Sequence, residues 1–255
     1  MKHLFRRVAA GAFCLSLTMM GSTASSVTAQ TATATRGGAQ SIDRKRLSEA
    51  AKESRDAAKA FNDIVRVPDK AIPKELIDRA EAIAVFPGVL KAAFIFGGRG
   101  GDGVISRRTA SGWSAPAFFN LGGGSFGAQI GASKTDYVLL FMNEGALKGL
   151  LEDKFEIGGE VGIAAGPVGR AASASTNATL DAAILSYSRS KGAFVGAALK
   201  GVVINPDNNL NEAIYGGMKA RDVLLGTQTM MQMPRGTEAF PLELTRYSSR
   251  RAASR

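Results

Sequence analysis

The sequence predicts an α+β fold in which N-terminal amphipathic helices pack on a strongly curved, glycine-rich antiparallel β-sheet, half-barrel or barrel-like in form. One long helical pattern precedes a succession of short strand-like runs, which is the element order of an α+β protein. Glycine accounts for 18 of the 73 residues in the segment 97–169. Several of these glycines fall inside strand patterns, where glycine marks bends or close backbone approach. The sheet is therefore expected to curve strongly.

The first residues have the three parts of a secretory signal peptide. Lys2, Arg6 and Arg7 lie in a basic start, residues 8–20 form an apolar stretch, and residues 27–29 (VTA) give a small-x-small cleavage pattern. The apolar stretch is too short to span a bilayer. We expect export to the periplasm or the outside, with peripheral attachment to a membrane. The expected organisation is a signal peptide at 1–29, a flexible leader at 30–41, one domain at 42–245 and a basic flexible tail at 246–255.

Two residue types limit the chemistry. The chain has one cysteine, Cys14, and one histidine, His3, and both lie in the expected signal peptide. Thiol nucleophiles, histidine acid/base catalysis and Cys/His zinc sites are thereby excluded from the mature chain. No cofactor, no metal and no enzymatic activity are expected. The net charge is +10, of which three charges lie in the signal peptide, so an exported chain of +7 would meet anionic lipid more readily than nucleic acid.

Residues 42–65 have the apolar spacing of an amphipathic helix. At about 100° per residue, its cations fall along one flank and its acids toward the back. Two roles remain open, and they can coexist. The apolar stripe packs on the sheet, or it lays Leu47, Phe61, Ile64 and Val65 into a head-group interface while the cations meet acidic lipid. The cations of this flank are Arg44, Lys45, Lys52, Arg55 and Lys59.

The remaining elements follow from local patterns. A second helix is expected from Pro73, whose fixed φ suits a first helical position, to Glu81, and Pro87-Gly88 is expected to end the first strand. Runs of β-branched and aromatic residues predict strands at 83–86, 92–98, 103–108, 113–119, 125–133, 137–142, 156–165, 182–190 and 193–204. Short helices are expected at 144–151, 211–215 and 220–225.

Residues 98–103 (GRGGDG) have the G-x-G-x-x-G spelling of a dinucleotide site. A β-like run follows, however, where such a site needs a helix N-terminus. We therefore expect a tight hairpin whose glycines take positive φ, with Arg99 at its tip and no bound nucleotide.

Two further motifs are better explained as local structure than as functional sites. Ser188 and Lys191 give an S-x-x-K spelling, but the S-D-N and K-T-G partners of penicillin-recognising enzymes do not occur. A strand end turning at Gly192 is expected instead. Residues 207–212 begin like an EF-hand loop but lack its glycine and its final carboxylate, so a loop capped by Asp207 or Asn209 before a short helix is favoured.

Ordered blocks from about residue 43 to 227 resemble the SYLF-domain family. The blocks are 72–76 (IPKEL), 82–89 (AIAVFPGV), the 97–103 loop, 113–119 (WSAPAFF), 129–132 (QIGA), 135–138 (TDYV), 164–170 (AAGPVGR), 186–192 (SYSRSKG) and 213–216 (AIYG).

The resemblance implies a non-enzymatic module that binds phosphoinositides and membranes, and that in some eukaryotic members also binds actin filaments. The family's lipid binding is associated with its N-terminal amphipathic segment, which corresponds here to residues 42–65. The chain departs from those relatives in its signal peptide and in having no attached FYVE or other adaptor module. The expected ligand is therefore a generic anionic lipid rather than cytosolic actin or phosphoinositide.

The expected function is binding of anionic, phosphoinositide-like lipid or a membrane surface. Two alternatives remain: a structural or protein-interaction envelope protein without lipid affinity, its partner unknown, and a hydrolase using a pair from Asp102, Asp136, Glu156 and Glu160. The residues expected to meet lipid are the five cations of the helix at 42–65 together with Arg99, Arg107, Arg108, Arg189 and Lys191.

Overall fold

The computed structural model describes residues 31–67, 71–93, 96–126, 131–152, 155–158, 162–168, 182–190, 193–196, 199, 201–226 and 233–248. The chain divides into an N-terminal unit, Met1–Ala39, and a main unit, Gln40–Arg255. The fold given below is that of the main unit. The expected signal peptide at 1–29 lies outside the described residues, as does Lys191.

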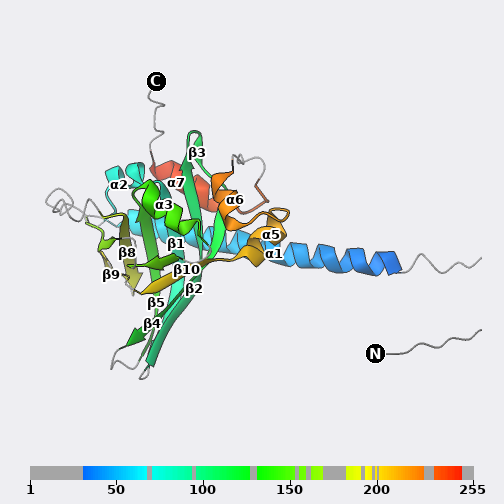
Figure 1. Cartoon of the computed structure of the whole chain (residues 1–255), viewed down its shortest axis with the longest axis horizontal. Coiled ribbons are helices and arrows are strands. Elements are labelled where there is room, and N and C mark those ends of the chain that lie inside the picture. Colours follow the sequence, from blue (N-terminus) through cyan, green and yellow to red (C-terminus); the bar gives the residue numbers. More distant parts are fainter. Residues whose placement is uncertain are drawn as a thin grey trace, which may run out of the picture. The chain divides into compact units, whose positions relative to one another are not determined.

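Within the described residues, ten strands form one sheet. Its order is β6-β10-β4-β2-β1-β5-β8-β7, with β3 paired to β2 and β9 paired to β8. The sheet is strongly curved and nearly closed, which confirms the expected fold class (Figure 1). It is mixed rather than wholly antiparallel, because β7 runs parallel to β8. The strands are β1 (Ala82–Ala93), β2 (Phe96–Thr109), β3 (Gly112–Trp113), β4 (Ala117–Phe126), β5 (Gly131–Phe141), β6 (Phe155–Ile157), β7 (Ile163–Ala165), β8 (Ile184–Ser190), β9 (Ala193–Gly196) and β10 (Val202–Pro206).

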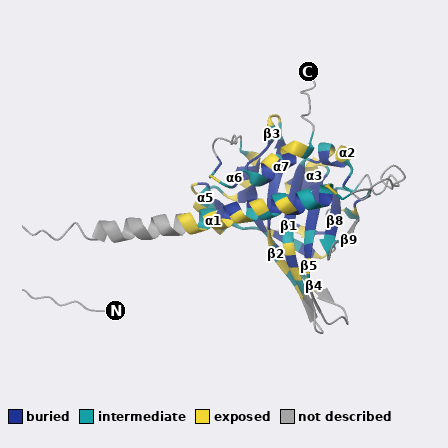
Figure 2. Cartoon of the chain, turned by 180° about the vertical axis from the view of Figure 1, so that it is seen from behind, coloured by how far each residue is buried: buried dark blue, intermediate teal, exposed yellow. Residues whose placement is uncertain are grey.

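Helices cover both faces of the sheet. Helix α1 crosses the face turned away from the viewer in Figure 1 and toward the viewer in Figure 2, whereas α3 lies on the other face. None of the helices in the described part of the chain combines the length and hydropathy that a bilayer span requires. The helices are α1 (Thr31–Val65), α2 (Lys74–Arg79), α3 (Glu144–Leu150), α5 (Asn208–Ile214), α6 (Ala220–Leu225) and α7 (Ala239–Tyr247).

Residues 98–103 lie inside a strand, so the expected hairpin is wrong. β2 passes through them unbroken and pairs on both sides, with Arg99 opposite Lys91 of β1 and Gly123 of β4. The described glycines of this segment do not take positive φ. A glycine-rich run with one aspartate has the local signal of a turn, but ladder partners on both sides hold it extended. No helix N-terminus follows, so the motif has no phosphate-binding geometry.

Gly103 is required by packing. A Cβ at this position would overlap the ring of Phe86, whereas at Gly98 it would meet nothing within 4 Å. We expect Gly103→Ala to lower the free energy of unfolding by about 1–3 kcal/mol, because the core must shift. Gly98→Ala should be neutral or stabilising by up to ~1 kcal/mol, because alanine restricts the unfolded chain. Urea denaturation measures both, and equal losses would show that the contact with Phe86 does not decide the effect.

β1 passes Pro87-Gly88 through a bulge instead of ending there. The register shifts between Val85 and Leu90, and Gly88 takes a φ of +60°. The Gly88 amide donates to Asp136 Oδ1 at 2.8 Å. A bulge with a left-handed glycine is a known way to bend a strand without ending it, so β1 continues to Ala93.

Several element boundaries differ from those expected. The leader expected at 30–41 is helical from Thr31, because no proline stops α1 from extending toward the N-terminus. α7 was not expected, since Pro241 weakens the helical pattern, yet proline is tolerated in a first turn. Arg246 and Tyr247, expected in a tail, lie in α7, and residues 249–255 of that expected tail lie outside the described residues. Five expected strands each span a break between two observed strands: 92–98, 113–119, 125–133, 156–165 and 193–204.

Other expectations hold. β8 ends at Ser190 and β9 begins at Ala193, so the S-x-x-K spelling lies at a strand end as expected. Asp207 caps α5, with its Oδ1 accepting from the Leu210 amide at 3.0 Å. The expected helix at 220–225 agrees with α6 at both ends.

Candidate functional site

Helix α1 buries one stripe and exposes the opposite one. Four residues of the apolar stripe are fully buried in the core: Ala50, Ala57, Phe61 and Ile64. Phe61 and Ile64 are therefore unavailable for insertion into a head-group interface, and the packing role of the stripe is confirmed. The residues on the outer flank are exposed, and exposed residues appear in yellow along α1 in Figure 2. These outer cations are Arg44, Lys45, Lys52, Arg55 and Lys59, called below the basic face.

Contacts with α7 and with the turn before it fix the rotation of α1 about its own axis. The Ser54 hydroxyl donates to the Thr237 carbonyl at 2.6 Å and accepts from the Phe240 amide at 3.0 Å. The rings of Phe61 and Tyr247 meet edge to face at 5.8 Å. Ser54 and Phe61 are seven residues apart, about two helical turns, and so lie on the same side of α1. Their contacts hold that side inward, and the basic face therefore points outward.

Two cations of the basic face are already paired. Lys52 Nζ lies 2.6 Å from Asp56 Oδ2, and Lys59 Nζ lies 2.7 Å from Asp63 Oδ2. The hydrogen bond to Asp56 raises the pKa of Lys52, and the hydrogen bond from Lys59 lowers the pKa of Asp63. Among the described residues, Arg44, Lys45 and Arg55 form no ion pair. Their charges are therefore the ones most available to an external anion.

The structure brings Arg189 to α1. Its Nη1 lies 2.9 Å from Asp63 Oδ2, although the two residues are far apart in the chain. Arg189 therefore lies next to the C-terminal end of the basic face, but its charge is shared with Asp63.

The other expected site residues do not join this surface. Arg108 is 8% exposed, and its guanidinium donates to the carbonyls of Ile77 and Ala80 at 2.6 and 2.9 Å. It also lies over the Trp113 ring, 4.3 Å from the centroid. Its role is to hold the end of α2 rather than to meet lipid. Arg99 and Arg107 are half-buried on β2, and the Nε atom of each is buried without a hydrogen bond within the described part of the chain.

The inner flank of α1 carries a carboxyl with an unusual protonation state. Burial, aided by the negative charges of Asp102, Glu49 and Asp207, raises the pKa of Glu53 to about 8. At neutral pH this side chain is therefore mostly uncharged. Glu53 lies on the inner flank, but Asp56 and Asp63, which were also expected toward the back of the helix, pair with Lys52 and Lys59. Residues four apart share a side of a helix, so the expected separation of cations and acids is wrong for these two residues.

The carboxylates considered for a hydrolase are not brought together. Asp102 lies on β2 and Glu156 on β6, and β4 and β10 separate these strands, a spacing of ~14 Å at the usual strand separation. Asp136 already accepts from the Gly88 amide, and Glu160 lies outside the described residues. Among the described residues, no three His, Cys, Asp or Glu side chains are placed to hold a metal ion.

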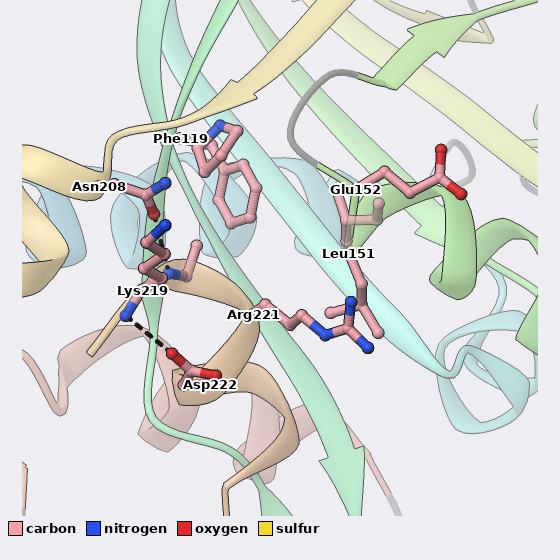
Figure 3. Close-up of a pocket in the computed structure, with 10 residues that line it drawn as sticks. Phe119, Leu151, Glu152, Asn208, Lys219, Arg221 and Asp222 are labelled. Atoms are coloured by element: carbon pink, nitrogen blue, oxygen red, sulfur yellow. Dashed lines mark hydrogen bonds between the residues drawn. The ribbon is translucent and has the colours of Figure 1, made fainter.

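A pocket of about 420 Å³ opens between α3, α6 and the end of β10 (Figure 3). No local sequence pattern marks it, because its walls come from five separate elements. Half of its lining is apolar and half is polar or charged. The lining residues are Phe119, Leu150, Leu151, Glu152, Pro206, Asn208, Lys219, Ala220, Arg221 and Asp222.

Residues 122–245 match the model of a family described as Ysc84, "Las17-binding protein actin regulator". "LAS seventeen-binding protein 3" of Saccharomyces cerevisiae is 36% identical over 173 residues, which cover 64% of this chain and 38% of the yeast protein. "SH3 domain-containing YSC84-like protein 1" of Xenopus laevis is 32% identical over 183 residues, covering 68% of this chain and 54% of the frog protein. The Bos taurus protein of the same name is 29% identical over 217 residues, covering 79% of this chain and 63% of its own length. The chain thus spans from about two fifths to under two thirds of these relatives.

Proposed function

Because the chain belongs to the SYLF, or Ysc84, family, we propose that it is a non-enzymatic binding protein that attaches to anionic membrane surfaces through the basic face of α1. The observation that carries the proposal is the fixed orientation of that helix. Its apolar stripe is buried and locked by α7, so its cations form a preset, outward-facing row. A polybasic surface of this kind is attracted to acidic lipid by roughly 1 kcal/mol for each cation near the surface.

The attachment is electrostatic rather than insertive. With Phe61 and Ile64 inside the core, α1 offers the bilayer charge and little apolar area. Such binding lacks the hydrophobic contribution of an inserted amphipathic helix. It should therefore be reversible and should weaken as salt screens the charges.

Replacing Lys45 and Arg55 by glutamine tests the basic face. Neither side chain has an ion pair among the described residues, and glutamine keeps helix propensity nearly constant, so folding should be unaffected. Binding to vesicles of phosphatidylcholine and phosphatidylserine should weaken by about 2 kcal/mol, or roughly 30-fold. Vesicle flotation at low and high salt measures the loss, and the difference between variant and parent should shrink at high salt.

The matched control removes the same charge from the other side of the sheet. Lys219→Gln with Arg221→Gln should leave vesicle binding nearly unchanged, since both residues lie at the pocket. If this control loses as much affinity as the α1 variant, net charge rather than the basic face governs attachment, and the proposal fails.

The family description favours a second candidate, a protein partner connected with actin regulation. The matched segment, 122–245, does not include α1, so such a partner would use the body of the domain. Co-sedimentation with filamentous actin, in the absence of vesicles, tests it. The Lys45 and Arg55 variant should then pellet like the parent, whereas loss of pelleting in that variant would count against a separate surface.

We also propose that the chain is exported and cleaved after Ala29, on the strength of its basic, apolar and small-residue segments in order. Mass analysis of the protein from the periplasm or medium should give an N-terminus at Gln30. A cytoplasmic protein that retains Met1 would exclude export.

A further inference from the structure

We propose that the pocket between α3 and α6 is a second binding site, which takes a small amphiphilic anion. Its apolar part would lie against the walls formed by Phe119, Leu150 and Leu151, and its carboxylate or similar group would be held by Arg221. This site is distinct from the basic face of α1 and does not depend on it.

The size of the pocket limits the ligand. A volume of about 420 Å³ lies within the usual range of ligand sites. At roughly 30 Å³ for each water-sized group, it holds on the order of fourteen such groups. That is enough for one short chain or ring system with a head group, and too little for a lipid with two long chains.

The walls of the pocket are preformed. Asp222 Oδ2 accepts from the Lys219 amide at 3.1 Å, and Asn208 Oδ1 accepts from the Ala220 amide at 3.1 Å. The first bond caps the start of α6, and the second fixes it against the start of α5. Phe119, Leu150 and Ala220 are each no more than 2% exposed, so the base of the pocket is part of the packed core. Ligand binding should therefore require little additional ordering of the protein, so the conformational entropy lost on binding should be small.

The charges at the pocket favour an anion. Two carboxylates, Asp222 and Glu152, and two cations, Lys219 and Arg221, lie at the pocket. The Asp222 carboxylate accepts from the Lys219 amide. In Figure 3 the guanidinium of Arg221 reaches toward Leu151, across the opening, while the carboxylate of Glu152 points away from the other labelled residues. None of the described residues forms an ion pair with Arg221. The guanidinium of Arg221 is therefore the charged group beside the apolar wall where a head group would lie, and a planar guanidinium binds a carboxylate by two parallel hydrogen bonds.

The pocket and the basic face lie on opposite faces of the sheet. Arg189, which pairs with α1, is opposite Asp136 of β5, whereas Phe141 of the same strand contacts Phe155 beside α3. Residues 136 and 141 differ by an odd number, so their side chains point to opposite faces. A protein attached to a membrane through α1 would thus keep the pocket open to water, and both ligands could bind at once.

Titration with three eight-carbon probes tests the site: octanoate, octylammonium and 1-octanol. We expect octanoate to bind, with backbone amide NMR shifts at Leu151 and Ala220, and the other two probes to bind at least 10-fold more weakly. Arg221→Gln should weaken octanoate at least 10-fold. Glu152→Gln should leave octanoate binding unchanged or tighter, and Arg79→Gln, on the exposed side of α2, should leave it unchanged.

The outcomes separate the possibilities. Equal binding of octanol and octanoate would mean that the pocket takes up apolar chains without regard to charge. Preferential binding of octylammonium would mean that the pocket prefers a cation. Either result overturns the proposal. So does the absence of binding by any probe. Because Arg221 and Glu152 are exposed, circular dichroism should show unchanged folding in their variants. Arg221→Gln should still bind acidic vesicles like the parent, so failure at this pocket leaves the membrane proposal intact.

Discussion

Replacing Arg108 by methionine is expected to lower the free energy of unfolding by about 3–5 kcal/mol. The guanidinium is buried and donates to the carbonyls of Ile77 and Ala80, which lie where α2 ends. Methionine preserves most of the side-chain volume but leaves these two acceptors without that donor, at about 1–3 kcal/mol for each buried group. It also removes the contact between the cation and the Trp113 ring, which contributes roughly a further 1 kcal/mol.

The neighbouring residue supplies the control. Arg107→Met removes the same charge one position away, where the Nε atom makes no hydrogen bond among the described residues. Its loss should stay below about 1 kcal/mol. Chemical denaturation of both variants measures the difference. If Arg107→Met destabilises as much as Arg108→Met, the carbonyls at the end of α2 are not what makes Arg108 important.

Replacing Glu53 by glutamine is expected to stabilise the protein at pH 9 by about 3 kcal/mol. The pKa of Glu53 is near 8 in the fold, against an ordinary value of 4.5. Between these two values the folded state binds the extra proton, so stability falls as pH rises from about 4.5 to about 8 and then levels off. The full shift corresponds to ~5 kcal/mol, and solvent screening of a partly exposed side chain reduces the expected effect to about 3 kcal/mol.

The pH profile distinguishes this cause from a general effect of charge. Below pH 4.5 Glu53→Gln should have nearly the stability of the parent, and the gain should develop as pH rises toward 8. Glu75→Gln, on the exposed side of α2, removes a carboxyl elsewhere in the domain and should not show this gain. A gain for Glu53→Gln that does not vary between pH 4 and pH 9 would show that ionisation of this carboxyl is not the cause.

Local periodicity was enough to predict α1 from residue 42 to its end, and which side of that part is buried. Ala50, Ala57 and Phe61 recur at helical spacing, and burial follows from that spacing directly. The same reasoning placed the outward cations correctly, because solvent-facing positions are the complement of the buried stripe.

Residues whose role depends on distant chain could not be predicted. Arg108 has the appearance of a surface cation in a strand, since nothing near it in sequence reveals the carbonyls at the end of α2. Residues 98–103 have a turn-like composition, and only the pairing of β2 with β1 and β4 shows that they are extended. The pocket joins side chains from β4, α3, β10, α5 and α6, so no single segment carries its signature.

The bonds between α1 and α7 also determine when the chain can finish folding. Ser54 bonds to Thr237 and Phe240, and Tyr247 accepts from Arg66 and donates to Asn62. These contacts join residues more than 180 positions apart, so the first helix of the domain cannot dock until the last one has been synthesised. Closing so long a loop is slow compared with forming local contacts. For a chain exported as proposed, this order of events delays the native state until translation is complete, which leaves the polypeptide unfolded for passage through a narrow translocation channel.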